Sequence, residues 1–100
     1  MFSGKYPYSK KNYMKERELY ETAANNFVKR YGYEVSPHII DVIISVMRTK
    51  DNTQQGGSFV QAVCANDLCG AIRAADTDCL NNLRIITLAS QFCNLQNKGL

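Results

Sequence analysis

The chain has 100 residues, 45% of them hydrophobic and 21% charged, and a formal net charge of +3. This length allows one domain with one small core, which leaves little room for a deep enzyme pocket. The longest apolar window, residues 39–47, is interrupted by Asp41 and Ser45 and is too short to cross a bilayer. The first residues, MFSGKYPYSKK, lack the apolar segment of a secretory signal, so we expect a cytoplasmic protein without membrane attachment.

The positive charge lies in the N-terminal third of the chain. Residues 1–31 contain seven basic and three acidic side chains, whereas residues 32–100 contain five basic and six acidic ones. The first segment therefore carries a net charge of +4 and the second a net charge of −1. This distribution argues against an acidic mimic of DNA and favours a partner with an acidic patch.

Apolar residues at helical spacing predict an all-α fold, a small single-domain bundle of about five helices. Residues 1–8 contain Gly4 and Pro7 and should form an extended arm, after which Ser9 can cap the first helix. One face of that helix carries Tyr20, Ala24, Phe27, Val28 and Tyr31. The expected helices of the domain, residues 1–100, cover residues 9–31, 37–50, 58–65, 67–75 and 78–93.

The second and fourth helices have clear start signals. Ser36 can cap the second helix, and Pro37 takes its first position, where no amide hydrogen bond is needed. Asn66 tolerates the left-handed conformation that ends a helix, and Asp67 can cap the fourth helix. The second helix should form the centre of the core through Ile39, Ile40, Ile43, Ile44 and Met47.

The last two helices are expected to bury their apolar residues in the same core. In the fourth helix, Gly70 suits a close approach between helices. The apolar positions of the fourth helix are Leu68, Cys69, Ala71, Ile72 and Ala75. Those of the last helix are Leu80, Leu83, Ile85, Ile86, Leu88 and Phe92.

The stretch QQGGSFVQ, residues 54–61, allows two interpretations. A glycine-rich turn before a helix can hold a phosphate on its backbone amides, but the lysine of a nucleotide-binding loop is missing. The alternative is a hinge followed by a capping box, in which Ser58 and Gln61 bond the first amides of the helix. The second interpretation explains these residues without a ligand.

The four cysteines are expected to be buried thiols rather than a disulfide or metal set. Cys64, Cys69, Cys79 and Cys93 form no Cys-x-x-Cys pair, and each lies in an apolar helical context. With His38 as the single histidine, a zinc site would need ligands scattered along the chain. We therefore expect no metal and no other cofactor.

Catalytic constellations find little support in the sequence. Ser36 and His38 lie close together, but Ser36 serves as a helix cap and no acid is obviously placed to orient the imidazole. Asp76 and Asp78 could form an acid–base pair or a metal clamp, yet two such residues at a helix start are typical capping groups. We expect a protein that is not an enzyme and has no small-molecule substrate.

The N-terminal segment is the surface that we expect to bind a partner. Its tyrosines alternate with lysines, and such rings among cations can stack on single-stranded nucleic acid or rest on an acidic protein. The alternative is a solvated arm whose tyrosines pack back on the bundle. The predicted contact residues are Lys5, Tyr6, Tyr8, Lys10, Lys11, Asn12, Tyr13 and Lys15.

The segment from Gly56 to Ile86 resembles a pattern found in small helical proteins encoded by phages and prophages. The matching positions look like caps and core residues, so they imply a fold and no catalytic role. They are Gly57, Ser58, Phe59, Ala62, Val63, Asn66, Asp67, Leu68, Ala71, Ala75, Asp76 and Leu83. Among studied phage proteins of this size are anti-CRISPR proteins, which bind a CRISPR effector complex and block its target DNA.

The resemblance implies a non-enzymatic inhibitor that binds a host protein or ribonucleoprotein complex in the host cytoplasm. A type I anti-CRISPR protein, which would contact the Cas proteins of an effector complex, is the most concrete form of this expectation. The alternative is a small nucleic-acid-binding regulator that uses the basic and aromatic N-terminal segment.

Overall fold

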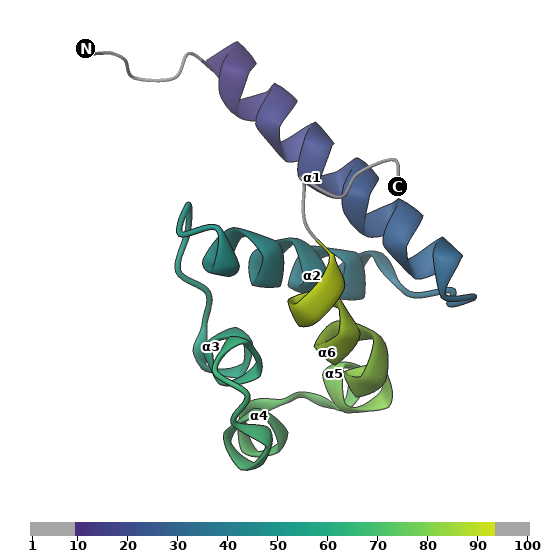
Figure 1. Ribbon diagram of the computed structural model, residues 1–100, viewed down its shortest axis with the longest axis vertical. Helices are drawn as coiled ribbons and strands as arrows, with labels where there is room; N and C mark the ends of the chain where they lie inside the picture. The colour runs from purple at the N-terminus through teal and green to yellow at the C-terminus, as the bar shows by residue number, and fades with distance from the viewer. Residues whose placement is uncertain (1–9, 94–100) are drawn as a thin grey trace.

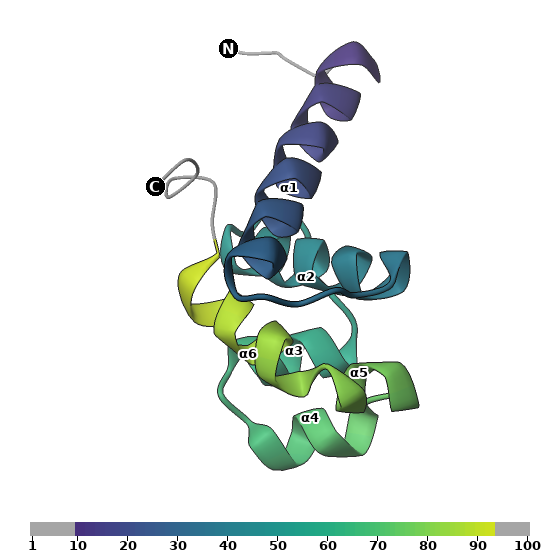
Figure 2. The same ribbon diagram turned by 90° about the vertical axis from the view of Figure 1, so that its right-hand side faces the viewer.

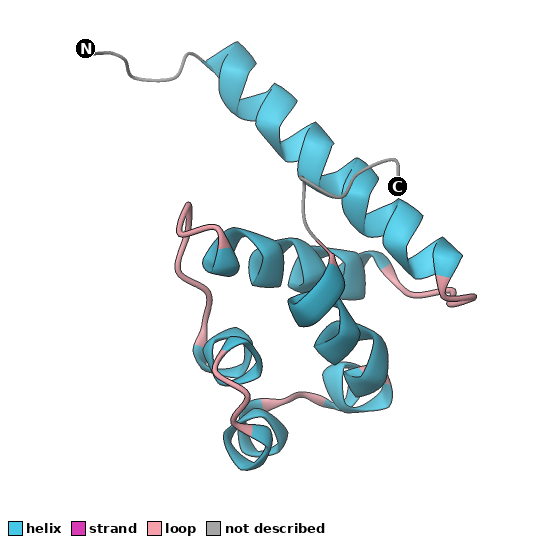
Figure 3. Ribbon diagram, viewed as in Figure 1, coloured by secondary structure: helices cyan, strands magenta, loops and turns pink. Residues whose placement is uncertain are grey.

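The computed structural model describes residues 10–93, and the side chains of residues 16–93. Over this part of the chain it shows an all-α domain (Figures 1 and 3). The predicted arm, residues 1–8, and the predicted cap Ser9 lie outside the described residues. The helices are α1 (Lys10–Arg30), α2 (Pro37–Lys50), α3 (Ser58–Cys64), α4 (Leu68–Ala74), α5 (Thr77–Asn81) and α6 (Leu83–Phe92).

Helix α2 lies at the centre of the fold and packs against α1, α3 and α6. Helix α1 crosses α2 on one side, while α3 to α6 lie on the other (Figures 1 and 2). The predicted face of α2 is buried throughout: Ile39, Ile40, Ile43, Ile44 and Met47. Since a buried aliphatic side chain contributes about 1.5–3 kcal/mol, this face supplies much of the stabilisation of the fold.

The predicted caps of α2 and α4 are confirmed. The hydroxyl of Ser36 accepts a hydrogen bond from the amide of Ile39, and the carboxylate of Asp67 accepts one from the amide of Gly70. Asn66 has a φ of 61°, the left-handed conformation that we expected. A Cβ at Gly70 would collide with the capping carboxylate of Asp67, so the glycine leaves room for this cap.

The predicted single helix over residues 78–93 is wrong. The structure has α5 and α6 in its place, and the break falls at Asn82, which has φ −120° and ψ 20°. The side-chain amide of Asn82 donates to the carbonyl oxygen of Asp78, at 2.9 Å. Asparagine side chains compete in this way with the backbone bonds of a helix, which accounts for the break. The described residues therefore form six helices, where we expected about five.

Several apolar residues that we expected in the core are exposed. Helix α4 packs mainly on α3, so no second helix among the described residues covers Leu68, Cys69 and Ile72 on its outer side. Tyr31, Leu80 and Phe92 are also exposed, near the ends of their helices. None of the described helices is both long enough and apolar enough to span a membrane.

Candidate functional site

The predicted contact residues divide into two groups. Three of them, Lys5, Tyr6 and Tyr8, lie outside the described residues. The other five, Lys10, Lys11, Asn12, Tyr13 and Lys15, lie on the first two turns of α1. These turns extend beyond α2 and the rest of the bundle (Figures 1 and 2). The structure therefore brings the five into one projecting segment, residues 10–15, whose backbone is helical.

The base of the projecting segment is held on α2 by a network around Arg48. The guanidinium of Arg48 is buried, donates to a carboxylate oxygen of Glu16 at 3.1 Å, and lies 4.7 Å from the ring centroid of Tyr20. The Tyr20 hydroxyl donates to a carboxylate oxygen of Asp51 at 2.8 Å. Burial raises the pKa of Tyr20 above its usual value. These contacts between α1 and α2 set the direction of α1 relative to the bundle.

A second, exposed ion pair also joins α1 and α2. Arg17 donates to a carboxylate oxygen of Asp41 at 2.9 Å, with both side chains about half exposed. In water such a pair contributes little to stability, but it takes up the cation next to the projecting segment.

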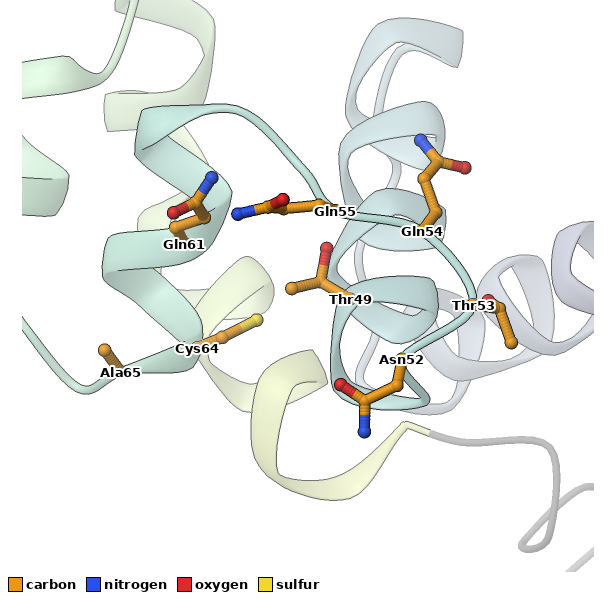
Figure 4. Close-up of a pocket in the computed structure, with 8 residues that line it drawn as sticks. All are labelled: Thr49, Asn52, Thr53, Gln54, Gln55, Gln61, Cys64 and Ala65. Atoms are coloured by element: carbon orange, nitrogen blue, oxygen red, sulfur yellow. The ribbon is translucent and has the colours of Figure 1, made fainter.

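A polar hollow of about 590 Å³ opens between the end of α2, the following loop and the second half of α3 (Figure 4). The side chains that line it are amides, hydroxyls, a thiol and a methyl group, with no formal charge. Such groups both donate and accept hydrogen bonds, which suits a backbone or another neutral polar surface. The lining residues are Thr49, Asn52, Thr53, Gln54, Gln55, Gln61, Cys64 and Ala65.

Gln54, Gln55 and Gln61 of the glycine-rich stretch line this hollow, and the predicted capping box is wrong. Gly57 is the N-cap residue of α3, and no side chain bonds the first amides of the helix. The Gln61 side chain instead donates to the carbonyl oxygen of Gly56, at 2.7 Å. Gly56 is buried, and a Cβ there would lie 2.9 Å from the Ser45 hydroxyl. The stretch is a close-packed turn that leads into α3. The interpretation as a turn without a ligand site fits this geometry, but the predicted side-chain cap does not.

A separate cluster of polar groups lies where α2 and α5 begin. The Nε2 atom of His38 is 3.1 Å from Oδ2 of Asp76, and the other carboxylate oxygen of Asp76 accepts from the amide of Cys79 at 2.7 Å. The Ser36 hydroxyl donates to Asp78 at 3.0 Å. Asp76 is therefore the helix cap that we predicted and also the acid beside His38 that we missed.

The cluster does not have the arrangement of a nucleophilic site. Burial, with the nearby Asp76 carboxylate, raises the pKa of the Cys79 thiol to about 11, so the thiol remains protonated at neutral pH. Hydrogen bonds from Cys79 and His38 lower the pKa of Asp76. The imidazole faces the carboxylate rather than a nucleophile, which is not the order that a catalytic triad requires.

The expectation of four buried thiols is correct for two of the cysteines. Cys79 and Cys93 are buried, whereas Cys64 is partly exposed and Cys69 is exposed on the outer side of α4. Burial raises the pKa of Cys93 to about 11 and also raises that of Cys64. The pattern of apolar neighbours in the sequence did not distinguish the two sides of α4.

Comparisons of the chain with protein-family models, with curated proteins and with solved structures found no match.

Proposed function

We propose that this protein is a non-enzymatic binding protein that docks on a macromolecular partner through the projecting segment of α1. The observation that carries this proposal is that residues 10–15 continue α1 beyond the bundle (Figure 2). A helix that extends beyond its own core offers its surface to another molecule.

The Arg48 network supports this proposal because it orients the segment. Glu16 and Tyr20, directly after the segment, are held against the buried guanidinium of Arg48. A binding helix whose direction is already set loses less conformational entropy when a partner binds. Three of its six residues are lysines, so an acidic patch on the partner would match it.

The partner that we propose is a host protein or ribonucleoprotein complex, most concretely a CRISPR effector complex whose access to target DNA is blocked. The resemblance of residues 56–86 to small phage-encoded proteins points to this class of partner and to the host cytoplasm. The basic projecting segment supports steric blocking at an acidic protein patch, since a DNA mimic would need an acidic face.

A pull-down from host lysate tests this function. We expect the full chain to capture a stoichiometric CRISPR effector complex. Capture should be lost in the triple variant Lys10→Ala/Lys11→Ala/Lys15→Ala. The matched control is Lys29→Ala/Arg30→Ala, which removes two cations from the opposite end of the same helix.

The possible outcomes separate the proposal from its alternative. Capture that survives the triple variant would show that the projecting segment is not the contact surface. Salt-sensitive binding to bare DNA or RNA that is lost in the triple variant would instead favour the nucleic-acid-binding regulator.

A further inference from the structure

We propose that the cluster of His38, Asp76 and Cys79 is a binding site for a zinc ion. An imidazole nitrogen, a carboxylate oxygen and a sulfur from these residues lie within 4.8 Å of one another. Zinc binds all three kinds of donor, whereas magnesium and calcium are bound by oxygen donors. This site is independent of the projecting segment of α1 and of the function proposed for it.

The fold presents the three donors from two helix starts that are far apart in the sequence. His38 is the second residue of α2, while Asp76 caps α5 and Cys79 lies in the first turn of that helix. Asp76 caps the helix with Oδ1, so that Oδ2 is the oxygen nearest to the imidazole nitrogen, at 3.1 Å. Both carboxylate oxygens thus have a defined direction before any ion arrives.

The distances are close to those that a zinc ion would impose. Bonds of about 2.0–2.3 Å in a tetrahedral arrangement place neighbouring donor atoms roughly 3.3–3.8 Å apart. Donors within 4.8 Å can reach that spacing through side-chain rotation of His38, which is about half exposed. Water can occupy the fourth position, because His38 and Asp76 both lie at the surface.

The charges of the cluster also suit a divalent cation. Zinc would displace the thiol proton of Cys79 to solvent and bind the thiolate, so that this sulfur and the Asp76 carboxylate together balance its charge. Asp78, whose carboxylate accepts from Ser36 at 3.0 Å, adds a further negative charge beside the cluster. These anions offset the positive ends of α2 and α5, which would otherwise disfavour a cation.

Cobalt substitution tests the site on the full chain under reducing conditions. We expect one equivalent of Co²⁺ to give the visible absorption of a tetrahedral ion together with a thiolate-to-cobalt charge-transfer band, and Zn²⁺ to displace it. The charge-transfer band should be lost in Cys79→Ser. The variants His38→Gln and Asp76→Asn should each weaken zinc binding at least about tenfold in competition with a chromophoric chelator.

Two controls make the result decisive. Cys69→Ser removes an exposed thiol outside the cluster and should leave the spectrum and the affinity unchanged. His38→Gln changes an exposed side chain, and Asp76→Asn keeps an oxygen that can cap α5, so both variants should remain folded by circular dichroism. Absence of the charge-transfer band, its persistence in Cys79→Ser or its loss in Cys69→Ser would each overturn the proposal.

Discussion

The two ends of α2 are each joined to another helix by a polar or charged side chain, but the two junctions differ in their exposure to water. At the C-terminal end, the side chain of Arg48 is 6% exposed and bonds Glu16 of α1. At the N-terminal end, the side chain of His38 is 52% exposed and faces Asp76, the cap of α5. Both contacts have the same length, 3.1 Å, so distance does not distinguish them.

The difference lies in what surrounds each pair. A charge that is buried with its partner becomes strongly destabilising when that partner is removed, whereas water and salt screen an exposed pair. The Arg48 junction also includes a ring contact with Tyr20, which adds packing to the charge. We therefore expect the Arg48 junction to contribute more to stability than the His38 junction, which is the proposed zinc site.

Of these substitutions, replacing Arg48 with alanine should lower the free energy of unfolding the most. The substitution removes the guanidinium that Glu16 and the Tyr20 ring both contact, and it opens a gap between α1 and α2. We expect a loss of about 3 kcal/mol in the free energy of unfolding, the lower end of the range for a broken buried pair, since Glu16 is partly exposed. Urea denaturation followed by circular dichroism measures it.

Lys50→Ala is the matched control for this substitution. Lys50 lies in the same last turn of α2 but is exposed, so its removal should change the free energy of unfolding by less than about 0.5 kcal/mol. If both variants lose the same stability, burial is not what distinguishes Arg48.

The buried thiol of Cys93 should give an intermediate effect that depends on pH. Its sulfur lies 3.5 Å from that of Met47, near the C-terminal end of α2, and burial raises its pKa from 9.0 to about 11. An unfolded chain releases this proton above pH 9, but the folded chain retains it until about pH 11. The stabilisation is therefore complete below pH 9 and is lost as the pH rises towards 11.

The size of this loss follows from the linkage of folding to protons. One thiol contributes at most about 1.4 kcal/mol per pH unit to the fall in the free energy of unfolding. Because lysines titrate in the same range, the quantity to measure is the difference in slope between the natural chain and Cys93→Ala. The exposed Cys69→Ser should keep the natural slope, and an equally steep fall in Cys93→Ala would contradict the assignment.

The features that were predictable from the sequence depend on near neighbours. Ser36 caps α2 through the amide of Ile39, three residues away, and the buried face of α2 repeats at the spacing of a single helix. The break at Asn82 is also local, but the competing bond from its side chain to Asp78 is not visible in an apolar pattern.

The charged junctions could not be predicted because their partners are distant in the sequence. Glu16 and Arg48 are 32 residues apart, and His38 and Asp76 are 38 residues apart. Hydrophobic spacing shows which face of α2 is buried but not which helix covers it. For the same reason Leu68 and Ile72 were expected in the core, although the described structure places no second helix over that side of α4.

The exposed junction at His38 should give the smallest effect on stability when no metal is present. In a chelating buffer at neutral pH, His38→Gln should shift the urea midpoint very little, since water screens this pair. Asp76→Ala should lower the midpoint more, because it also removes the oxygen that accepts from the Cys79 amide, whereas Asp76→Asn should keep most of this cap. A large drop in the urea midpoint of His38→Gln under these conditions would mean that the imidazole stabilises the fold to an extent comparable to Arg48. A small loss there, with a larger one in Asp76→Ala, would show that the cap stabilises α5 while the His38 contact contributes little to stability in the absence of metal.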